Sequence, residues 1–191
     1  MTQRTALILV DLQNDYFPDG KWELDQVETV AANASRLLSA FRERGELVVH
    51  VRHEFPTLEA PFFVPGSHGA EHHSSVQPAS GEPVVKKQQI NSFRDTDLKA
   101  ILDKSGVDSV LIAGAMSHMC IDAVTRAASD FGYQCTVAHD ACATLELEFL
   151  GKKIPSQQVH GAFMAALAFG YASVVSTDEA LEQFQAKTSD E

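Results

Sequence analysis

Apolar residues recur along this chain in two alternating patterns. The unbroken apolar run at 5–10 is typical of a strand buried on both faces of a parallel sheet. Further strands are predicted at 46–52, 83–87, 107–114, 133–139 and 172–175. Elsewhere apolar residues repeat with the period of an amphipathic helix, over 27–44, 97–104, 117–131 and 157–169, with a short helix after 177. Strands that alternate with helices predict an α/β fold, in which helices cover both faces of a parallel sheet.

The segment 53–81 shows neither pattern. It is rich in proline, glycine, serine and histidine. A loop of this length in a compact domain usually has a function, as a lid, a pocket wall or a contact between subunits. The chain is otherwise predicted to be one domain over 1–191, ending in a helix and acidic tail at 178–191, because its length suits a single complete core.

Composition and charge narrow the function classes. Hydrophobic residues make up 45% of the chain and charged residues 21%, as in ordinary soluble globular proteins. The formal net charge of −11 argues against nucleic acid and anionic membranes as partners, since both need clustered Lys and Arg. The sequence has neither a signal-peptide pattern nor an apolar run of about 20 residues. Its three widely spaced cysteines predict no disulfide framework and a cytoplasmic location.

Cys120 is predicted to lie just inside the helix that follows the strand 107–114. Unpaired N–H groups and the helix dipole stabilise a thiolate there, and a nearby cation can lower a thiol pKa to roughly 3.5–7.5. The same N–H groups can stabilise an oxyanion. A lone cysteine in a helix is also often a small buried hydrophobic residue, and both interpretations stay open at this point.

Two further residues follow strands of the same sheet: Asp11 after the first and Lys87 at the end of the third. Sites in open parallel sheets form beyond the carboxyl ends of the strands. Asp11 would suit a base that takes the thiol proton and returns it to a leaving amine, and Lys87 would supply positive charge. Each residue alone could be an ordinary cap or a solvated side chain, but all three at equivalent strand ends indicate a site.

Three blocks carry a resemblance to a known family: Asp-Leu-Gln-Asn-Asp-Tyr-Phe at 11–17, Val-Lys-Lys at 85–87 with Asn-Ser-Phe at 91–93, and Gly-Ala-Met-Ser-His-Met-Cys-Ile at 114–121. In this order they resemble the isochorismatase-like cysteine hydrolases, which include nicotinamidases, N-carbamoyl-amide hydrolases and isochorismatases. The resemblance extends from residue 6 to about 177. It implies a three-layer α/β/α, Rossmann-like fold with a six-stranded parallel sheet of order 3-2-1-4-5-6.

By position, the resemblance implies a catalytic triad of Asp11, Lys87 and Cys120. Lys87 is preferred to its neighbour Lys86 because it stands six residues before Phe93. The family also implies a cis peptide at Ala115–Met116 and an oxyanion hole made by the backbone N–H groups of Met116 and Cys120. It further suggests a homodimer or homotetramer.

Two departures from the family pattern narrow the chemistry. Metal-dependent nicotinamidases carry an Asp-x-His and a further His shortly after the second strand, whereas residues 52–56 here read Arg-His-Glu-Phe-Pro. We therefore expect no metal and no cofactor, and we expect His68, His72 and His73 to be solvent-exposed loop residues. Isochorismatases proper cleave a vinyl ether without needing the cysteine, so the presence of Cys120 favours cleavage of an acyl C–N bond.

Aromatic residues that flank the three blocks are candidates for binding a planar or amide substrate. The candidate substrate-binding residues are Phe17, Trp22, Phe93 and His118. Core packing accounts for Phe93 equally well. Asp140, at the end of the fifth strand, is predicted to be a structural cap rather than a catalyst.

The sequence thus predicts a metal-independent cysteine hydrolase that cleaves an amide or carbamoyl bond of a small molecule through a thioester. Three alternatives stay open. They are a vinyl-ether hydrolase of the isochorismatase type, a catalytically silent binding or assembly module, and a redox sensor that pairs Cys120 with Cys135 or Cys142.

Overall fold

A computed structural model describes residues 4–186. Its main element is a six-stranded sheet of order β3-β2-β1-β4-β5-β8 in which every neighbouring pair is parallel. The strands are β1 (Thr5–Val10), β2 (Val48–His53), β3 (Val84–Lys87), β4 (Ser109–Ala115), β5 (Gln134–Ala143) and β8 (Ser173–Val175). The predicted fold class and strand order are confirmed, with β8 as the sixth strand of the predicted order.

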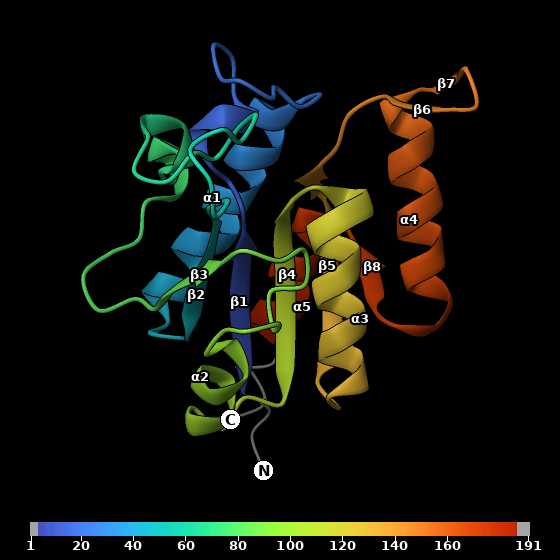
Figure 1. The fold of residues 1–191 in the computed structure, drawn as a ribbon. Coiled ribbons are helices and arrows are strands. Elements are labelled where there is room, and N and C mark those ends of the chain that lie inside the picture. The colour runs from blue at the N-terminus through green and yellow to red at the C-terminus, as the bar shows by residue number, and fades with distance from the viewer. Residues whose placement is uncertain (1–3, 187–191) are drawn as a thin grey trace.

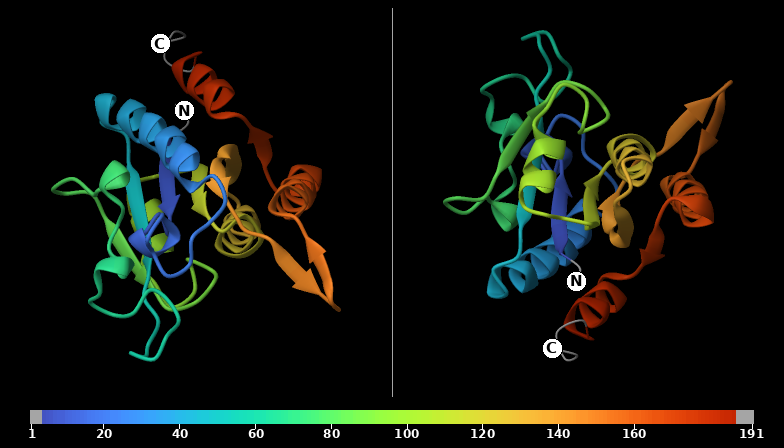
Figure 2. Two further views of the ribbon diagram at one scale, coloured as in Figure 1. Left: turned by 90° about the horizontal axis from the view of Figure 1, so that it is seen from above. Right: turned by 90° about the horizontal axis from the view of Figure 1, so that it is seen from below.

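Helices cover both faces of this sheet (Figures 1 and 2). On one face lie α1 (Val27–Glu43) and α5 (Thr177–Ala186), whose side chains share one core cluster. On the other lie α2 (Leu98–Lys104), α3 (Asp122–Asp130) and α4 (Ser156–Gly170), which share a second cluster. The molecule therefore has the three layers that the resemblance implied.

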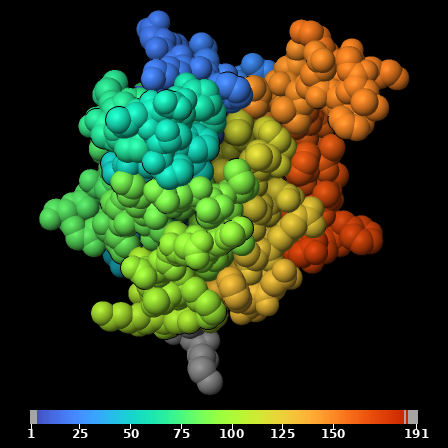
Figure 3. Space-filling view, viewed as in Figure 1, coloured from blue at the N-terminus to red at the C-terminus, as the bar shows by residue number. Residues whose placement is uncertain are grey.

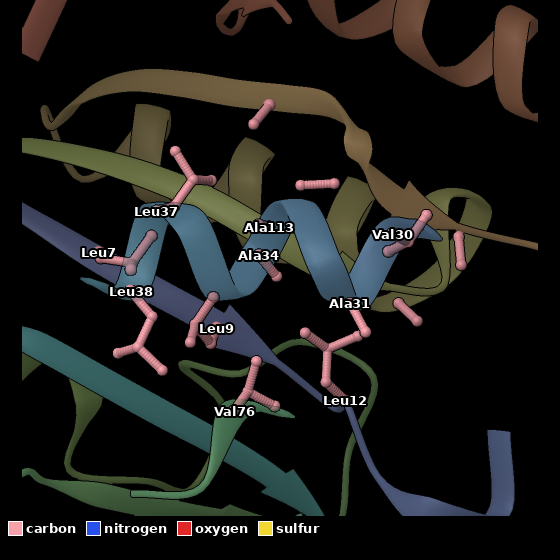
Figure 4. Close-up of a cluster of buried hydrophobic side chains, with 14 of the residues drawn as sticks. Leu7, Leu9, Leu12, Val30, Ala31, Ala34, Leu37, Leu38, Val76 and Ala113 are labelled. Atoms are coloured by element: carbon pink, nitrogen blue, oxygen red, sulfur yellow. The ribbon is translucent and has the colours of Figure 1, made fainter. Parts of the chain in front are cut away.

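β1 shows how the sequence builds both cores. Successive side chains of a strand point to opposite faces. Leu7 and Leu9 accordingly pack with α1 on one face, and Ala6, Ile8 and Val10 pack on the other. Figure 4 shows the α1 side, where Ala34, Leu37 and Leu38 of the helix lie over Leu7 and Leu9. An uninterrupted apolar run is needed because neither face of β1 meets solvent.

Three local predictions differ from the structure. The strand expected at 133–139 continues to Ala143, because a bulge shifts the β4–β5 register from Ile112↔Val137 to Gly114↔Cys142. The helix expected at 117–131 begins as a π-turn, Ser117–Ile121, before α3. A hairpin of β6 (Leu147–Phe149) and β7 (Lys152–Ile154) was not predicted, because its short strands are charged and largely exposed. It projects from the body of the molecule (Figure 2).

The loop between β2 and β3 folds back over the chain that follows β1. Its two short 3-10 turns are His68–Ala70 and Ser74–Val76. Backbone hydrogen bonds join it to the post-β1 segment, from the Asn14 N–H to Glu71 and from the His73 N–H to Leu12. In Figure 3 the loop forms the cyan and green surface below the blue residues of that segment. The residues the structure describes include no helix both long and apolar enough to span a membrane.

Gly114 is required where β1 and β4 meet. Its φ is 132°, and a Cβ at this position would lie 2.0 Å from the carbonyl oxygen of Val10. We expect Gly114→Ala to lower the free energy of unfolding by about 3 kcal/mol, as in strongly overpacked sites, measured by urea denaturation. Gly45→Ala is the matched control, because Gly45 also has a positive φ but open space around it. Equal losses in the two variants would contradict the steric argument.

Candidate active site

The carboxyl ends of β1, β3 and β4 bring three side chains together. Lys87 Nζ lies 2.8 Å from Asp11 Oδ2 and 3.2 Å from Cys120 Sγ. Lys87 is therefore the residue that joins the carboxylate and the thiol. All three residues are buried, with exposed fractions of 0% for Asp11, 1% for Lys87 and 4% for Cys120. The predicted residues therefore form one contiguous cluster.

The sheet order explains how Lys87 reaches its partners. Lys87 ends β3, and β2 separates β3 from β1. Two interstrand spacings amount to about 10 Å, a gap that a long side chain can bridge. Asp11 follows β1 directly with a φ of 52°, a left-handed conformation that aspartate tolerates better than most residues. Unusual backbone conformations of this kind concentrate at functional sites.

Cys120 lies within the π-turn. The N–H groups of Met119 and Ile121 both donate to the carbonyl oxygen of Met116. The Ala115–Met116 peptide is cis, as the resemblance implied. Wide π-type turns occur often at functional sites.

The electrostatics of the cluster differ from the sequence-based expectation. Burial raises the pKa of the Cys120 thiol to about 12, and the Asp11 carboxylate acts in the same direction against Lys87. The expected low thiol pKa is therefore wrong. The Asp11–Lys87 pair is already neutral, so a thiolate would leave an uncompensated negative charge in a buried site.

Lys87 keeps its charge in this site. Burial opposes the ammonium form, but the neighbouring Asp11 and Cys120 outweigh that effect and raise the pKa of Lys87. At rest Lys87 is thus an ammonium and Cys120 a protonated thiol, so a base must remove the thiol proton during attack.

Two polar residues of the site were missed by sequence reasoning. His53 Nδ1 lies 3.0 Å from Lys87 Nζ. Gln13 is fully buried and binds the backbone of two other segments: its Oε1 accepts from the His53 N–H, and its Nε2 donates to the carbonyl oxygens of His53 and Ala70. Gln13 belongs to the block 11–17, but a glutamine after a strand looks like a surface turn residue. No spacing could have linked His53 to Lys87.

Asp15 and Tyr16 are also buried next to the cluster. Asp15 Oδ2 accepts a 2.6 Å hydrogen bond from the N–H of Phe63 and so ties the long loop to the site. Tyr16 is 2% exposed, and burial, followed by the charges of Asp11 and Cys120, raises its pKa well above the usual value. Its ring packs 4.6 Å from that of Phe63.

The candidate substrate-binding residues are scattered around the fold. Trp22 is 38% exposed and stacks on Phe62, which in turn packs against Tyr16. Phe17 is buried and stacks on His73. Aromatic contacts therefore connect Trp22, through Phe62, to Tyr16 beside the triad, whereas the ring of Phe17 contacts His73.

The other two candidates have partners elsewhere. His118 Nδ1 lies 2.7 Å from Thr144 Oγ1. Phe93 packs against Phe131 and Tyr133, which follow the C-terminal end of α3, whereas Cys120 precedes its N-terminal end. The aromatic contacts of Phe93 therefore lie at the C-terminal end of α3, and its role in substrate binding stays a prediction.

A cavity of about 280 Å³ lies between α1, β5 and the N-terminal end of α4, away from the triad. Thr144, His139 and His160 contribute to its lining, and the three triad residues do not. Asp140, on the same bulge of β5, accepts hydrogen bonds from the N–H and Oγ1 of Thr177 at 2.7 and 2.6 Å. It caps α5, as predicted.

The loop histidines only partly match their predicted exposure. His68 is exposed, whereas His72 is 7% exposed and His73 is half-buried against Phe17. The expectation is therefore wrong for His72, because the loop folds inward at its short bridge to Gln13. Among residues 4–186, no three His, Cys, Asp or Glu side chains are grouped so as to hold a metal ion.

Two buried histidines predict a pH-dependent stability. Burial, with the nearby Lys87, lowers the pKa of His53 to about 4, and burial with nearby positive groups does the same for His72. Between pH 4 and 6.5 the unfolded chain binds protons that the folded chain does not, so stability rises with pH across this window. We expect a slope of about 1 kcal/mol per pH unit for each histidine, measured by urea unfolding. His72→Asn should reduce the slope and His68→Asn should leave it unchanged; a flat wild-type profile would contradict the prediction.

A family model described as the isochorismatase domain matches residues 5–179, which include the whole triad. The chain belongs to the isochorismatase family. The uncharacterized isochorismatase family protein YddQ of Bacillus subtilis is 48% identical over 178 residues, covering 93% of this chain and 99% of that protein. This isochorismatase-family chain is also 58% identical to a crystal structure from Oleispira antarctica, described provisionally as an isochorismatase hydrolase. The TM-score is 0.92, with 95% of this chain and 98% of that chain covered.

A more distant relative carries a named activity. The maleamate amidohydrolase of Pseudomonas putida is 27% identical over 197 residues, which cover 96% of this chain and 88% of that enzyme. The family resemblance first indicated by the three sequence blocks is confirmed, and relatives described as hydrolases support hydrolytic chemistry for this member of the isochorismatase family.

Proposed function

We propose that this isochorismatase-family protein is a metal-independent cysteine hydrolase that cleaves the C–N bond of a small amide or carbamoyl compound. The observation that carries the proposal is the buried contact of Lys87 Nζ with both Asp11 Oδ2 and Cys120 Sγ. Similarity to a maleamate amidohydrolase supports the C–N bond as the one cleaved.

In the first step Asp11 acts as the general base. Its carboxylate takes the proton of the Cys120 thiol while the sulfur attacks the substrate carbonyl carbon, and the carbonyl oxygen becomes an oxyanion. This route suits a thiol whose pKa is raised to about 12, because proton transfer and attack occur together. The negative charge moves from Asp11 to the oxyanion, so Lys87 balances one anion throughout.

The backbone around Cys120 would stabilise the oxyanion. The N–H groups of Met116 and Cys120 are the donors that the resemblance implies, and the turn that carries them is closed by two hydrogen bonds to the carbonyl oxygen of Met116. Donors held in place before reaction are effective because they need not reorganise as charge develops.

The second half of the reaction uses the same groups in reverse. Protonated Asp11 gives its proton to the leaving nitrogen as the C–N bond breaks, which releases an amine or ammonia and leaves a thioester on Cys120. Asp11 then takes a proton from water, the resulting hydroxide attacks the thioester, and the proton returns to the sulfur as the C–S bond breaks. The product is a carboxylic or carbamic acid.

The test is an ammonia-release screen of the purified protein. Small aliphatic amides, ureides, carbamoyl compounds and nicotinamide are each incubated with and without EDTA. We expect at least one compound to release ammonia at a rate that EDTA does not change. Release that EDTA abolishes would contradict metal independence. No ammonia release from any compound of the panel would contradict the proposal and favour a catalytically silent binding module.

Association of two or four copies remains a prediction. Exposed apolar side chains on the β6–β7 hairpin and on α4 support it: Phe149 is 69%, Leu150 85% and Phe169 95% exposed. Large exposed apolar side chains of this kind are typical of protein contacts. Light scattering on the wild type and on Phe169→Asp should show an oligomer that the substitution weakens; a wild-type monomer would contradict the prediction.

A further inference from the structure

We propose that His53 is a fourth functional residue of the active site. Its Nδ1 positions the Lys87 ammonium, and its Nε2–H donates a hydrogen bond to an acceptor oxygen of the substrate. The inference rests on the proposed cysteine hydrolase function and adds to it a substrate requirement. The substrate must carry an oxygen acceptor beside the scissile carbonyl, such as a second carbonyl or a carboxylate.

The ring nitrogens of His53 can be assigned from their neighbours. Lys87 Nζ lies 3.0 Å from His53 Nδ1, and an ammonium can only donate. Nδ1 is therefore the unprotonated acceptor. The neutral ring carries its proton on Nε2, and the low pKa of His53, about 4, keeps it neutral at physiological pH.

The Nε2–H group is a buried donor without a partner. His53 is 4% exposed, and Nε2 makes no hydrogen bond to any residue in the described part of the chain. Buried donors are nearly always paired, and those that are not often mark a site that a ligand completes. His50 and His72 also have an unpartnered ring nitrogen, but His50 pairs with Glu82, and the two rings contact each other rather than the triad.

The surroundings hold His53 in one position. Gln13 binds both its N–H and its C=O, each at 2.8 Å. The ring lies 4.5 Å from that of Phe55 and 6.1 Å from that of Phe63. A hydrogen bond from a buried donor beside apolar rings to an oxygen acceptor is strengthened, because little water competes for the donor. A group this fixed suits substrate orientation.

Two substitutions separate the two roles. Nδ1 is two bonds from Cβ, as are the amide atoms of asparagine, and Nε2 is three bonds from Cβ, as are those of glutamine. His53→Asn can keep an acceptor for Lys87 and loses the substrate donor. His53→Gln can keep the substrate donor and loses the acceptor for Lys87. His53→Phe removes both and keeps the ring, and His68→Asn, on an exposed histidine of the loop, is the matched control.

The variants are compared on an amide that the wild type hydrolyses. We expect His53→Asn to raise KM about tenfold with little change in kcat, and His53→Gln to lower kcat about tenfold with little change in KM, the usual size of one lost hydrogen bond to a charged or reacting group. His53→Phe should show both losses. Equal effects of the Asn and Gln variants on kcat and KM, or no effect of either, would overturn the proposal.

Two readouts need no substrate and so separate this proposal from the proposed function. Alkylation of Cys120 by iodoacetamide, followed across pH, should be about tenfold slower in His53→Gln than in wild type and unchanged in His53→Asn. The ring tautomer of His53 in the wild-type protein, read from ¹⁵N chemical shifts, should be the Nε2–H form. An Nδ1–H tautomer would overturn the proposal whether or not any variant folds, and turnover that survives Cys120→Ala would overturn the proposed function alone.

Discussion

Substituting Cys120 with alanine is expected to abolish amide hydrolysis, by at least about a thousandfold in kcat/KM, because the variant has no atom that can form the acyl intermediate. The fold should survive, since only the sulfur atom of a small buried side chain is lost. Steady-state kinetics on the hydrolysed amide measure the loss, and circular dichroism checks the fold.

Cys135→Ala is the control for this experiment. Cys135 is also buried, but its sulfur contacts the carbonyl oxygens of Thr125 and Tyr133 rather than the triad. This variant should keep wild-type kinetics. If Cys120→Ala retained a substantial part of the activity, or Cys135→Ala lost it, the assignment of the nucleophile would be wrong.

Lys87→Met is expected to remove both activity and stability. Methionine approximates the volume of lysine, but without the ammonium the Asp11 carboxylate becomes an unpaired buried charge. Breaking a buried ion pair in this way costs about 3–5 kcal/mol. We therefore expect a loss of this size in the free energy of unfolding at neutral pH, measured in urea, and no detectable turnover.

The double variant Asp11→Asn/Lys87→Met separates the two consequences. It carries no buried charge at the site, so most of the lost stability should return, and asparagine accepts the left-handed backbone of position 11. Activity should stay absent, because the base is gone. A double variant as unstable as the sum of two independent losses would show that Asp11 and Lys87 are not energetically coupled.

The parts of the fold that could be predicted well from the sequence are those where burial dictates residue type on both faces. After a polar first residue, β1 and β4 are apolar to their ends because helices cover both sides of the sheet. Few structures other than a strand covered on both faces require such a pattern. The β6–β7 hairpin was not predicted, because it packs against little of the rest of the protein and its exposed residues show no hydrophobic periodicity. The β5 bulge was missed because it depends on register with β4, which no local pattern reveals.

Some residues of the candidate site could likewise be predicted from the sequence, and others could not. Asp11, Lys87 and Cys120 could be named because each ends or follows a strand, and parallel strands bring their carboxyl ends together. His53 and Gln13 could not, because their importance lies in contacts across 34 and 40 residues of sequence. The thiol pKa was predicted in the wrong direction because sequence position suggests a helix terminus but does not show how completely a group is buried.

Trapping the acyl-enzyme tests nucleophilic catalysis by Cys120 most directly. Wild-type protein is mixed with an amide that it hydrolyses, quenched in acid during turnover and analysed by intact mass and peptide mapping. We predict a mass gain equal to the acyl group on the peptide that contains Cys120, removable by hydroxylamine and absent in Cys120→Ala. Steady turnover without an adduct, combined with undiminished turnover in Cys120→Ala, would contradict this role for the cysteine.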